Sequence, residues 1–183
     1  MEVSTETKHI VSVSLGSSKR DANAVLELGG QKISIERRGT DGDFKKARQM
    51  MEAYDGKVDA IGLGGTDLYV YAGKKRYTFR ESARLIAGVK KTPVLDGSGL
   101  KNSLERKLIR TLAAGGEVPI KGSKVLLVCG VDRFGMAEAL QEAGADVMFG
   151  DLIFGLNVNK PLYSLKALSW WAALLAPIVT KLP

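Results

Sequence analysis

The stretch from Val125 to Asp151 constrains the fold most, because it alternates strand and helix patterns over a short length. One apolar run ends at Gly130, a helical pattern begins after Gly135, and a second apolar run ends just before Asp151. Two strands joined through one helix lie parallel, because the helix carries the chain back to the same end of the sheet. We therefore predict a Rossmann-like βαβ unit. Two strands alone do not make a stable sheet, so we expect them to join a larger one, made by the first half of the chain or by a partner.

The glycines of this stretch match part of a loop that binds dinucleotides. In the pattern G-x-G-x-x-G, glycines let the backbone approach a pyrophosphate, and the helix N-terminus supplies free N–H groups. Gly130 and Gly135 match its first and last glycines, and Asp151 has the place of the acid that binds ribose hydroxyls. Asp132 stands where the second glycine is expected, and its carboxylate would repel phosphate or cap the helix instead. Arg133 offers phosphate a cation, and the acidic Asp151 favours NAD over NADP as the cofactor.

Strand and hairpin patterns dominate the rest of the chain. Strand-like and hairpin-like patterns occupy residues 9–16, 23–40, 58–65 and 68–80, and helical spacing occupies 43–54, 81–90 and 103–116. The pair Gly29 and Gly30 is a strong hairpin-turn signal. We predict an α/β fold whose mixed sheet has antiparallel hairpins in the first half and the βαβ unit in the second, with helices on both faces.

A Pro- and Gly-containing segment, 117–123, separates two periodic regions and is the expected domain boundary. It divides the chain into an α/β lobe with hairpins, residues 1–117, and the βαβ unit with an apolar tail, residues 124–183. The alternative is one continuous sheet built by both parts.

The tail contains an apolar block, 167–179, interrupted only by Ser169. This block is shorter than the roughly 20 residues of a membrane span, and Pro177 is expected to end or kink its helix. We expect the block to pack on the sheet, on another subunit of a homo-oligomer, or on a C-terminal region that continues past this chain. The alternative is an interfacial or docking helix that uses Trp170 and Trp171.

Charge and composition narrow the possible partners. The net charge of +7 favours anionic ligands, but the basic residues are scattered and form no continuous stripe. We therefore expect a small anionic ligand rather than a specific nucleic acid. One histidine and one cysteine cannot build a zinc site of imidazoles and thiolates, and a single cysteine excludes an internal disulfide. With no apolar signal segment at the start, we expect a cytoplasmic protein.

The loop after the first predicted strand could also bind an anion. It contains Gly16, Ser17, Ser18, Lys19 and Arg20, which could surround a phosphate or only turn the chain. A similar succession of strands begins actin-like and ribonuclease-H-like folds, in which the first glycine turn contacts phosphate. The alternative function is therefore a non-catalytic nucleotide- or phosphate-binding α/β module.

Two further glycine-rich segments follow predicted strands. One carries Asp96, Lys101 and Asn102, and the other carries Thr66 and Asp67. Open α/β sheets bind ligands at the carboxyl ends of their strands, so these two ends favour a common crevice. A lysine and an aspartate that share a hydroxylated substrate can act as an acid–base pair. The alternative is a plain strand-to-helix connection with a solvated lysine.

Three stretches, KVDAIGLGGTDLY, TPVLDGSGLKNSLER and VDRFGMAEALQEAGADVMFGDLIFG, resemble a family of bacterial proteins named quinate 5-dehydrogenase. The similarity covers nearly the whole chain, and members of that family continue past its end. The resemblance implies an oxidoreductase that uses NAD or NADP to oxidise a cyclic polyol acid. It further implies that Lys101 shuttles the proton and that Asp96 or Asn102 binds a substrate hydroxyl. The cofactor would lie beside the βαβ loop described above.

Overall fold

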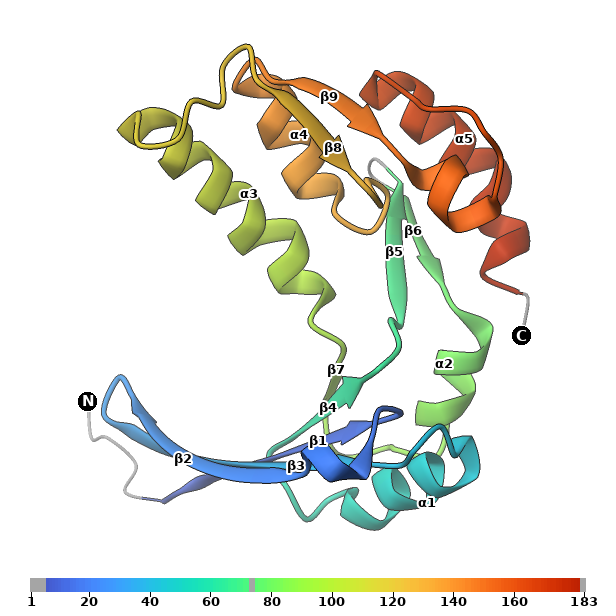
Figure 1. The fold of residues 1–183 in the computed structure, drawn as a ribbon. Helices are drawn as coiled ribbons and strands as arrows, with labels where there is room; N and C mark the ends of the chain where they lie inside the picture. The colour runs from blue at the N-terminus through green and yellow to red at the C-terminus, as the bar shows by residue number, and fades with distance from the viewer. Residues whose placement is uncertain (1–5, 73–74, 182–183) are drawn as a thin grey trace. The chain divides into compact units, whose positions relative to one another are not determined.

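The computed structural model describes residues 6–72 and 75–181, which form two compact units. The first unit comprises the chain as far as Leu68 together with Phe79–Gly97, and the second comprises Tyr69–Thr78 and the chain from Ser98 onwards. Both units contain helices and strands, so the predicted mixed α/β class is confirmed (Figure 1).

The first unit is built on a five-stranded sheet with the order β2-β3-β1-β4-β7. Its strands are β1 (Lys8–Ser14), β2 (Ala22–Leu28), β3 (Gln31–Gly39), β4 (Ala60–Gly64) and β7 (Val94–Leu95). β2 runs antiparallel to β3, and the other neighbouring pairs are parallel. The carboxyl ends of β3, β1, β4 and β7 therefore lie along one edge of the sheet. The hairpin predicted at Gly29 and Gly30 is confirmed, because both residues have a positive φ, as its tight turn requires.

Helix α1 (Phe44–Tyr54) covers one face of this sheet (Figure 1). Its N-cap is Asp43, whose carboxylate accepts the Lys46 N–H, so the predicted start of the helix is confirmed. Ala47 and Met51 are its buried residues. Alternate residues of β1 are buried as well, as expected for a strand with one covered face. The short helices η1 (Ser18–Arg20) and α2 (Arg80–Ile86) complete the unit.

The second unit contains the predicted βαβ unit. Strand β8 (Lys124–Leu127), helix α4 (Phe134–Glu142) and strand β9 (Asp146–Phe149) follow one another, and the two strands pair in parallel. The remaining elements are the hairpin β5 (Tyr69–Ala72) and β6 (Lys75–Thr78), helix α3 (Ser98–Gly115), the π-helical turn η2 (Asp151–Gly155) and helix α5 (Leu165–Val179). Part of the predicted turn of the β5–β6 hairpin, 73–74, lies outside the described residues.

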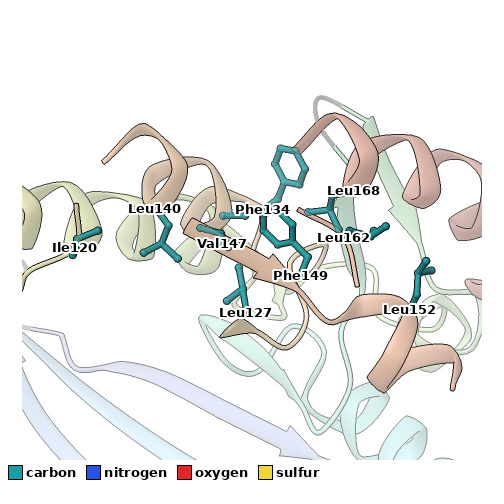
Figure 2. Packing of buried hydrophobic residues seen from close by; sticks show 10 residues of the cluster. Ile120, Leu127, Phe134, Leu140, Val147, Phe149, Leu152, Leu162 and Leu168 are labelled. Carbon is teal, nitrogen blue, oxygen red and sulfur yellow. The ribbon is translucent and has the colours of Figure 1, made fainter. Parts of the chain in front are cut away.

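In the described chain β8 and β9 do not join the sheet of the first half, so that part of the expectation is wrong. Within the described chain they form a sheet of their own, extended only by a bridge between Phe149 and Leu162. Helix packing supplies the burial that further strands would have provided. Figure 2 shows the cluster, which contains Phe134 and Leu140 of α4, Leu168 of α5 and the fully buried Phe149.

The division between the units differs from the boundary expected at 117–123. It falls between Gly97 and Ser98, because α3 packs on α4 and so belongs with the βαβ unit. The hairpin β5–β6 also belongs to the second unit, where β5 contacts α5. Local sequence patterns do not predict that α3 and the β5–β6 hairpin belong to the second unit, because both assignments depend on contacts between distant segments.

The apolar tail forms α5, with Ser164 as its N-cap. Pro177 does not end the helix, which continues to Val179. Pro177 has no N–H to bond the carbonyl of Ala173, one turn earlier in the helix. Because Ala173 is exposed, water can bind that carbonyl, and the proline destabilises the helix little. One side of α5 is buried, whereas Trp170, Leu174 and Ile178 stay more than half exposed. Among the helices that the structure describes, none is long and apolar enough to cross a membrane.

Candidate functional site

The loop between β8 and α4 is bound by a carboxylate of its own chain. Asp151, directly after β9, accepts the backbone N–H of Gly130 on Oδ2 at 2.9 Å and that of Val131 on Oδ1 at 2.8 Å. Free backbone N–H groups at this place would be the ones to bind a pyrophosphate. The residue expected to bind the ribose therefore takes up two N–H groups of the loop instead.

The charged side chains of the same loop are paired within the second unit. Lys101 Nζ lies 2.8 Å from Asp132 Oδ1, and Arg133 forms an ion pair with Glu105 of α3. That bond to Glu105 raises the pKa of the Arg133 guanidinium. Asp132 does not cap α4 as expected: the N-cap residue is Arg133, and its side chain makes no capping hydrogen bond. Arg133 is thus engaged by a carboxylate rather than offered to a phosphate.

Gly130 in the loop and Gly135 in the first turn of α4 are required by packing. A Cβ at Gly130 would lie 2.7 Å from Phe149 Cδ1 and 2.9 Å from Leu168 Cδ2, and one at Gly135 would lie 2.6 Å from the Asn102 backbone oxygen. Contacts this short are not tolerated, so glycine is needed here whether or not a ligand binds. With the Gly130 and Val131 N–H groups bound by Asp151 and the loop's charges paired, the loop as folded does not fit a dinucleotide pyrophosphate.

Three predicted substrate residues lie at the carboxyl edge of the sheet in the first unit. The Asp96 carboxylate, after β7, accepts the Leu68 N–H at 2.7 Å and so connects the segments that follow β7 and β4. Thr66, after β4, shares a 2.8 Å hydrogen bond with the buried Ser82 hydroxyl. Asp67 is the residue between Thr66 and Leu68. The sheet thus brings Thr66, Asp67 and Asp96 to one edge, as parallel strands require.

Lys101 and Asn102 belong to the second unit. They do not lie in a glycine loop as expected, because α3 already begins at Ser98 and includes both residues. Ser103, at the expected start of the helical spacing, lies inside the helix, and its hydroxyl donates to the Gly99 carbonyl. The glycines suggested a loop, but a helix of this length tolerates Gly99 in its first turn, so the prediction of a loop was wrong.

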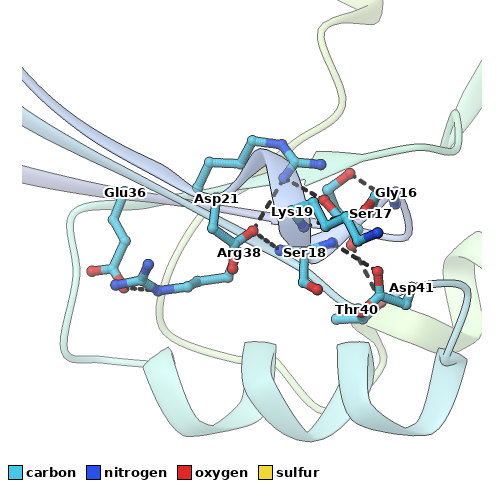
Figure 3. A network of polar contacts seen from close by, with 12 residues as sticks. Gly16, Ser17, Ser18, Lys19, Asp21, Glu36, Arg38, Thr40 and Asp41 are labelled. Carbon is cyan, nitrogen blue, oxygen red and sulfur yellow. Dashed lines mark hydrogen bonds and ion pairs between the residues drawn. The ribbon is translucent and has the colours of Figure 1, made fainter.

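The loop after β1 is held by aspartate carboxylates that accept hydrogen bonds from backbone N–H groups. The Asp41 carboxylate accepts the Ser18 N–H at 2.8 Å, and the Ser17 hydroxyl accepts the Lys19 N–H (Figure 3). The hydrogen bond from the Ser18 backbone lowers the pKa of the Asp41 carboxyl. Asp21 accepts the Gly39 N–H at 2.6 Å. These bonds set the loop across the ends of β1 and β3.

Two guanidinium groups converge on Gly16 in this loop. A Cβ at Gly16 would lie 2.6 Å from Arg20 Nη2 and 3.1 Å from Arg37 Nη2. Arg37 donates to the Asp21 carboxylate at 3.1 Å and to the Ser17 carbonyl at 3.0 Å, whereas the side chain of Arg20 has no hydrogen bond or ion pair within the described chain. We call the group formed by Gly16, Ser17, Arg20 and Arg37 the β1-loop site. It combines a side-chain-free glycine with an excess of positive charge.

Local sequence reasoning missed Arg37. The residue lies in β3 and reaches the loop because β3 pairs in parallel with β1, with Ser12 opposite Arg37 and Ser14 opposite Gly39. A hairpin reading of β2 and β3 predicts only their mutual antiparallel pairing, not which other strand β3 will join. Arg37 could therefore have been found from the strand order of the sheet, which places β3 next to β1.

Comparison with known proteins agrees with the division at Gly97 and Ser98, though not with the assignment of the β5–β6 hairpin, and it adds no activity. Residues 9–96 match a domain of unknown function, DUF8753, and residues 99–183 match another, DUF8754. Searches of curated proteins and of solved structures found no match. The two matched regions meet where the structure divides, next to Gly97 and Ser98. The resemblance to quinate 5-dehydrogenases gains no support from these matches and stays a prediction.

Proposed function

We propose that the first unit binds a small anion, a phosphate or a carboxylate, at the β1-loop site. The observation that carries this proposal is the convergence of Arg20 and Arg37 on Gly16, where a single carboxylate, Asp21, is bound to one of the two guanidinium groups. The function is that of a ligand-binding α/β module, as the composition and the loop sequence predict.

The electrostatics favour an anion at this place. Two like charges held close together repel each other, and an anion between them converts this repulsion into attraction. Guanidinium groups suit planar or tetrahedral oxyanions because their N–H donors form paired hydrogen bonds. The site also lies at the carboxyl ends of parallel strands, where open α/β sheets bind their ligands. The absent side chain at Gly16 lets both guanidinium groups lie close to the backbone at this edge.

The proposal is tested by calorimetric titration of the whole chain with inorganic phosphate and, separately, with quinate as a carboxylate. We expect Arg20→Gln to weaken binding by about tenfold or more, since a hydrogen bond to a charged group contributes about 1.5–3 kcal/mol. Arg48→Gln is the matched control, because it removes the same charge from α1, where Arg48 pairs with Glu52. Equal binding by the two variants, or none by the unaltered chain, would refute the proposal.

A dehydrogenase of a cyclic polyol acid is the second candidate, favoured by the parallel β8-α4-β9 unit. Binding of NAD or NADP at its loop would require Asp151 to release the Gly130 and Val131 N–H groups. Titration with both dinucleotides, followed by quinate turnover, tests it. Turnover that is lost in Lys101→Ala while folding is retained would support the proton-shuttle role of Lys101. Absence of both binding and turnover would remove this candidate.

A further inference from the structure

An apolar pocket lies in the second unit, and none of the residues used above for anion binding lines it. It has a volume of about 160 Å³ and is lined by residues of the loop after β8, of η2 and the chain after it, and of α5. Its walls include Leu152, Leu162, Leu168, Trp171 and Leu175. Among the described residues of the lining, Asp151 is the ionisable one.

The carboxylate of Asp151 is held firmly by backbone N–H groups. Each of its oxygens accepts one backbone N–H, from Gly130 and from Val131, which fixes its position at the pocket wall. Within the described residues no lysine or arginine forms an ion pair with it. A carboxylate can accept about four hydrogen bonds, so Asp151 retains acceptor capacity after these two. A partly buried carboxylate next to an apolar wall is stabilised by a cation that brings its own apolar body.

We propose that this pocket binds a small apolar amine, with its hydrocarbon ring inside the pocket and its ammonium group on Asp151. The volume suits a single ring, since an aliphatic cavity of about 150 Å³ is known to hold benzene. The charge of Asp151 selects a cation over a neutral or an anionic ring. The proposal is independent of the β1-loop site, because it uses another unit of the chain and a ligand of opposite charge.

The experiment is calorimetric titration of the whole chain with benzylamine, toluene and benzoate, three ligands with similar rings and different charges. We expect benzylamine to bind at least tenfold more tightly than toluene and benzoate not to bind. Gly155→Leu adds a side chain at the pocket wall, where a Cβ meets no atom within 4 Å, and we expect it to abolish binding. Gly99→Leu is the matched control, since its Cβ also meets nothing within 4 Å and it does not line the pocket.

Asp151→Asn separates the charge from the shape of the pocket. We expect this variant to bind benzylamine and toluene equally, with thermal unfolding used to show that it is folded. Equal binding of benzylamine and toluene by the unaltered chain would overturn the role of Asp151, and no benzylamine binding would overturn the site. Adenosine that binds more tightly than benzylamine and is lost in Gly155→Leu would also overturn the proposal, because the pocket would then be a nucleoside site.

Discussion

The loops after β1 and after β8 look alike in sequence, since each places charged residues beside a glycine at the end of a strand. In the β8 loop, Lys101 pairs with Asp132, Arg133 pairs with Glu105, and Asp151 takes two backbone N–H groups. In the β1 loop, the carboxylates bind backbone N–H groups, and Arg20 is left beside Arg37.

The difference shows what a glycine motif can and cannot predict. A glycine predicts that something approaches the backbone closely, but it does not say whether that is a ligand or part of the same chain. At Gly130 the approaching groups are Phe149, Leu168 and Asp151. At Gly16 they are two guanidinium groups. The β8 loop is closed by groups of its own unit, whereas the β1 loop has positive charge left for a ligand.

The largest effect is expected from removing the carboxylate that closes the β8 loop. Asp151→Ala leaves the Gly130 and Val131 N–H groups without their acceptor, and each such loss costs about 1–3 kcal/mol. We expect the free energy of unfolding of the second unit to fall by about 2–4 kcal/mol in urea denaturation. Asp146→Ala, at an exposed position in β9, is the control and should change it by less than about 0.5 kcal/mol. Similar values for both variants would mean that the loop is not held by Asp151.

A somewhat smaller effect is expected from adding a methyl group to the second glycine of that loop. In Gly135→Ala the new Cβ meets the Asn102 backbone oxygen, and such overpacking costs about 1–3 kcal/mol. Gly115→Ala, at the end of α3, meets nothing within 4 Å and should be neutral or slightly stabilising. Thermal unfolding of the two variants measures the difference. A stable Gly135→Ala protein would show that the glycine is not needed for packing.

Acidification should destabilise the first unit in a defined pH range. Asp41, Asp55 and Asp59 of this unit have carboxyl groups whose pKa is lowered by hydrogen bonds, from backbone N–H groups in all three and from the Lys8 ammonium in Asp59. A lowered pKa contributes stability above the unfolded value of about 3.9, and this contribution is lost as the pH falls through the folded value.

Tryptophan fluorescence can follow the second unit alone, because both tryptophans lie in α5. On lowering the pH from about 5 towards 2, we expect loss of far-ultraviolet circular dichroism to begin before the tryptophan signal changes. A tryptophan transition that comes first would contradict the prediction that the first unit is the more acid-sensitive.

The smallest effect is expected for the ion pair between Lys101 and Asp132, both about a quarter exposed. A double-mutant cycle with Lys101→Met and Asp132→Asn should give a coupling energy of about 0.5–1 kcal/mol in the free energy of unfolding. A coupling near zero would mean that the contact with Asp132 contributes nothing to stability, which would favour a role of Lys101 in the proposed dehydrogenase.

Much of the secondary structure could be predicted because its signals are local. The Gly29–Gly30 turn, the cap of α1 at Asp43 and the alternation of strand and helix around α4 each involve neighbouring residues. The convergence of Thr66 and Asp96 was also predictable, since parallel strands end at the same edge. The start of α3 was not, because a glycine-rich first turn resembles a loop until the packing of the helix on α4 is known.

The sequence by itself determined the α/β class, the hairpins and the βαβ unit, because backbone propensities and hydrophobic periods act over a few residues. Only the tertiary structure decided which groups meet at the glycines. Asp151 reaches Gly130, and Arg37 reaches Gly16, through strand pairings that join distant segments. Electrostatic and hydrogen-bond contacts depend on distance in space, so the chemistry of the two loops could not follow from the spacing of their glycines along the chain.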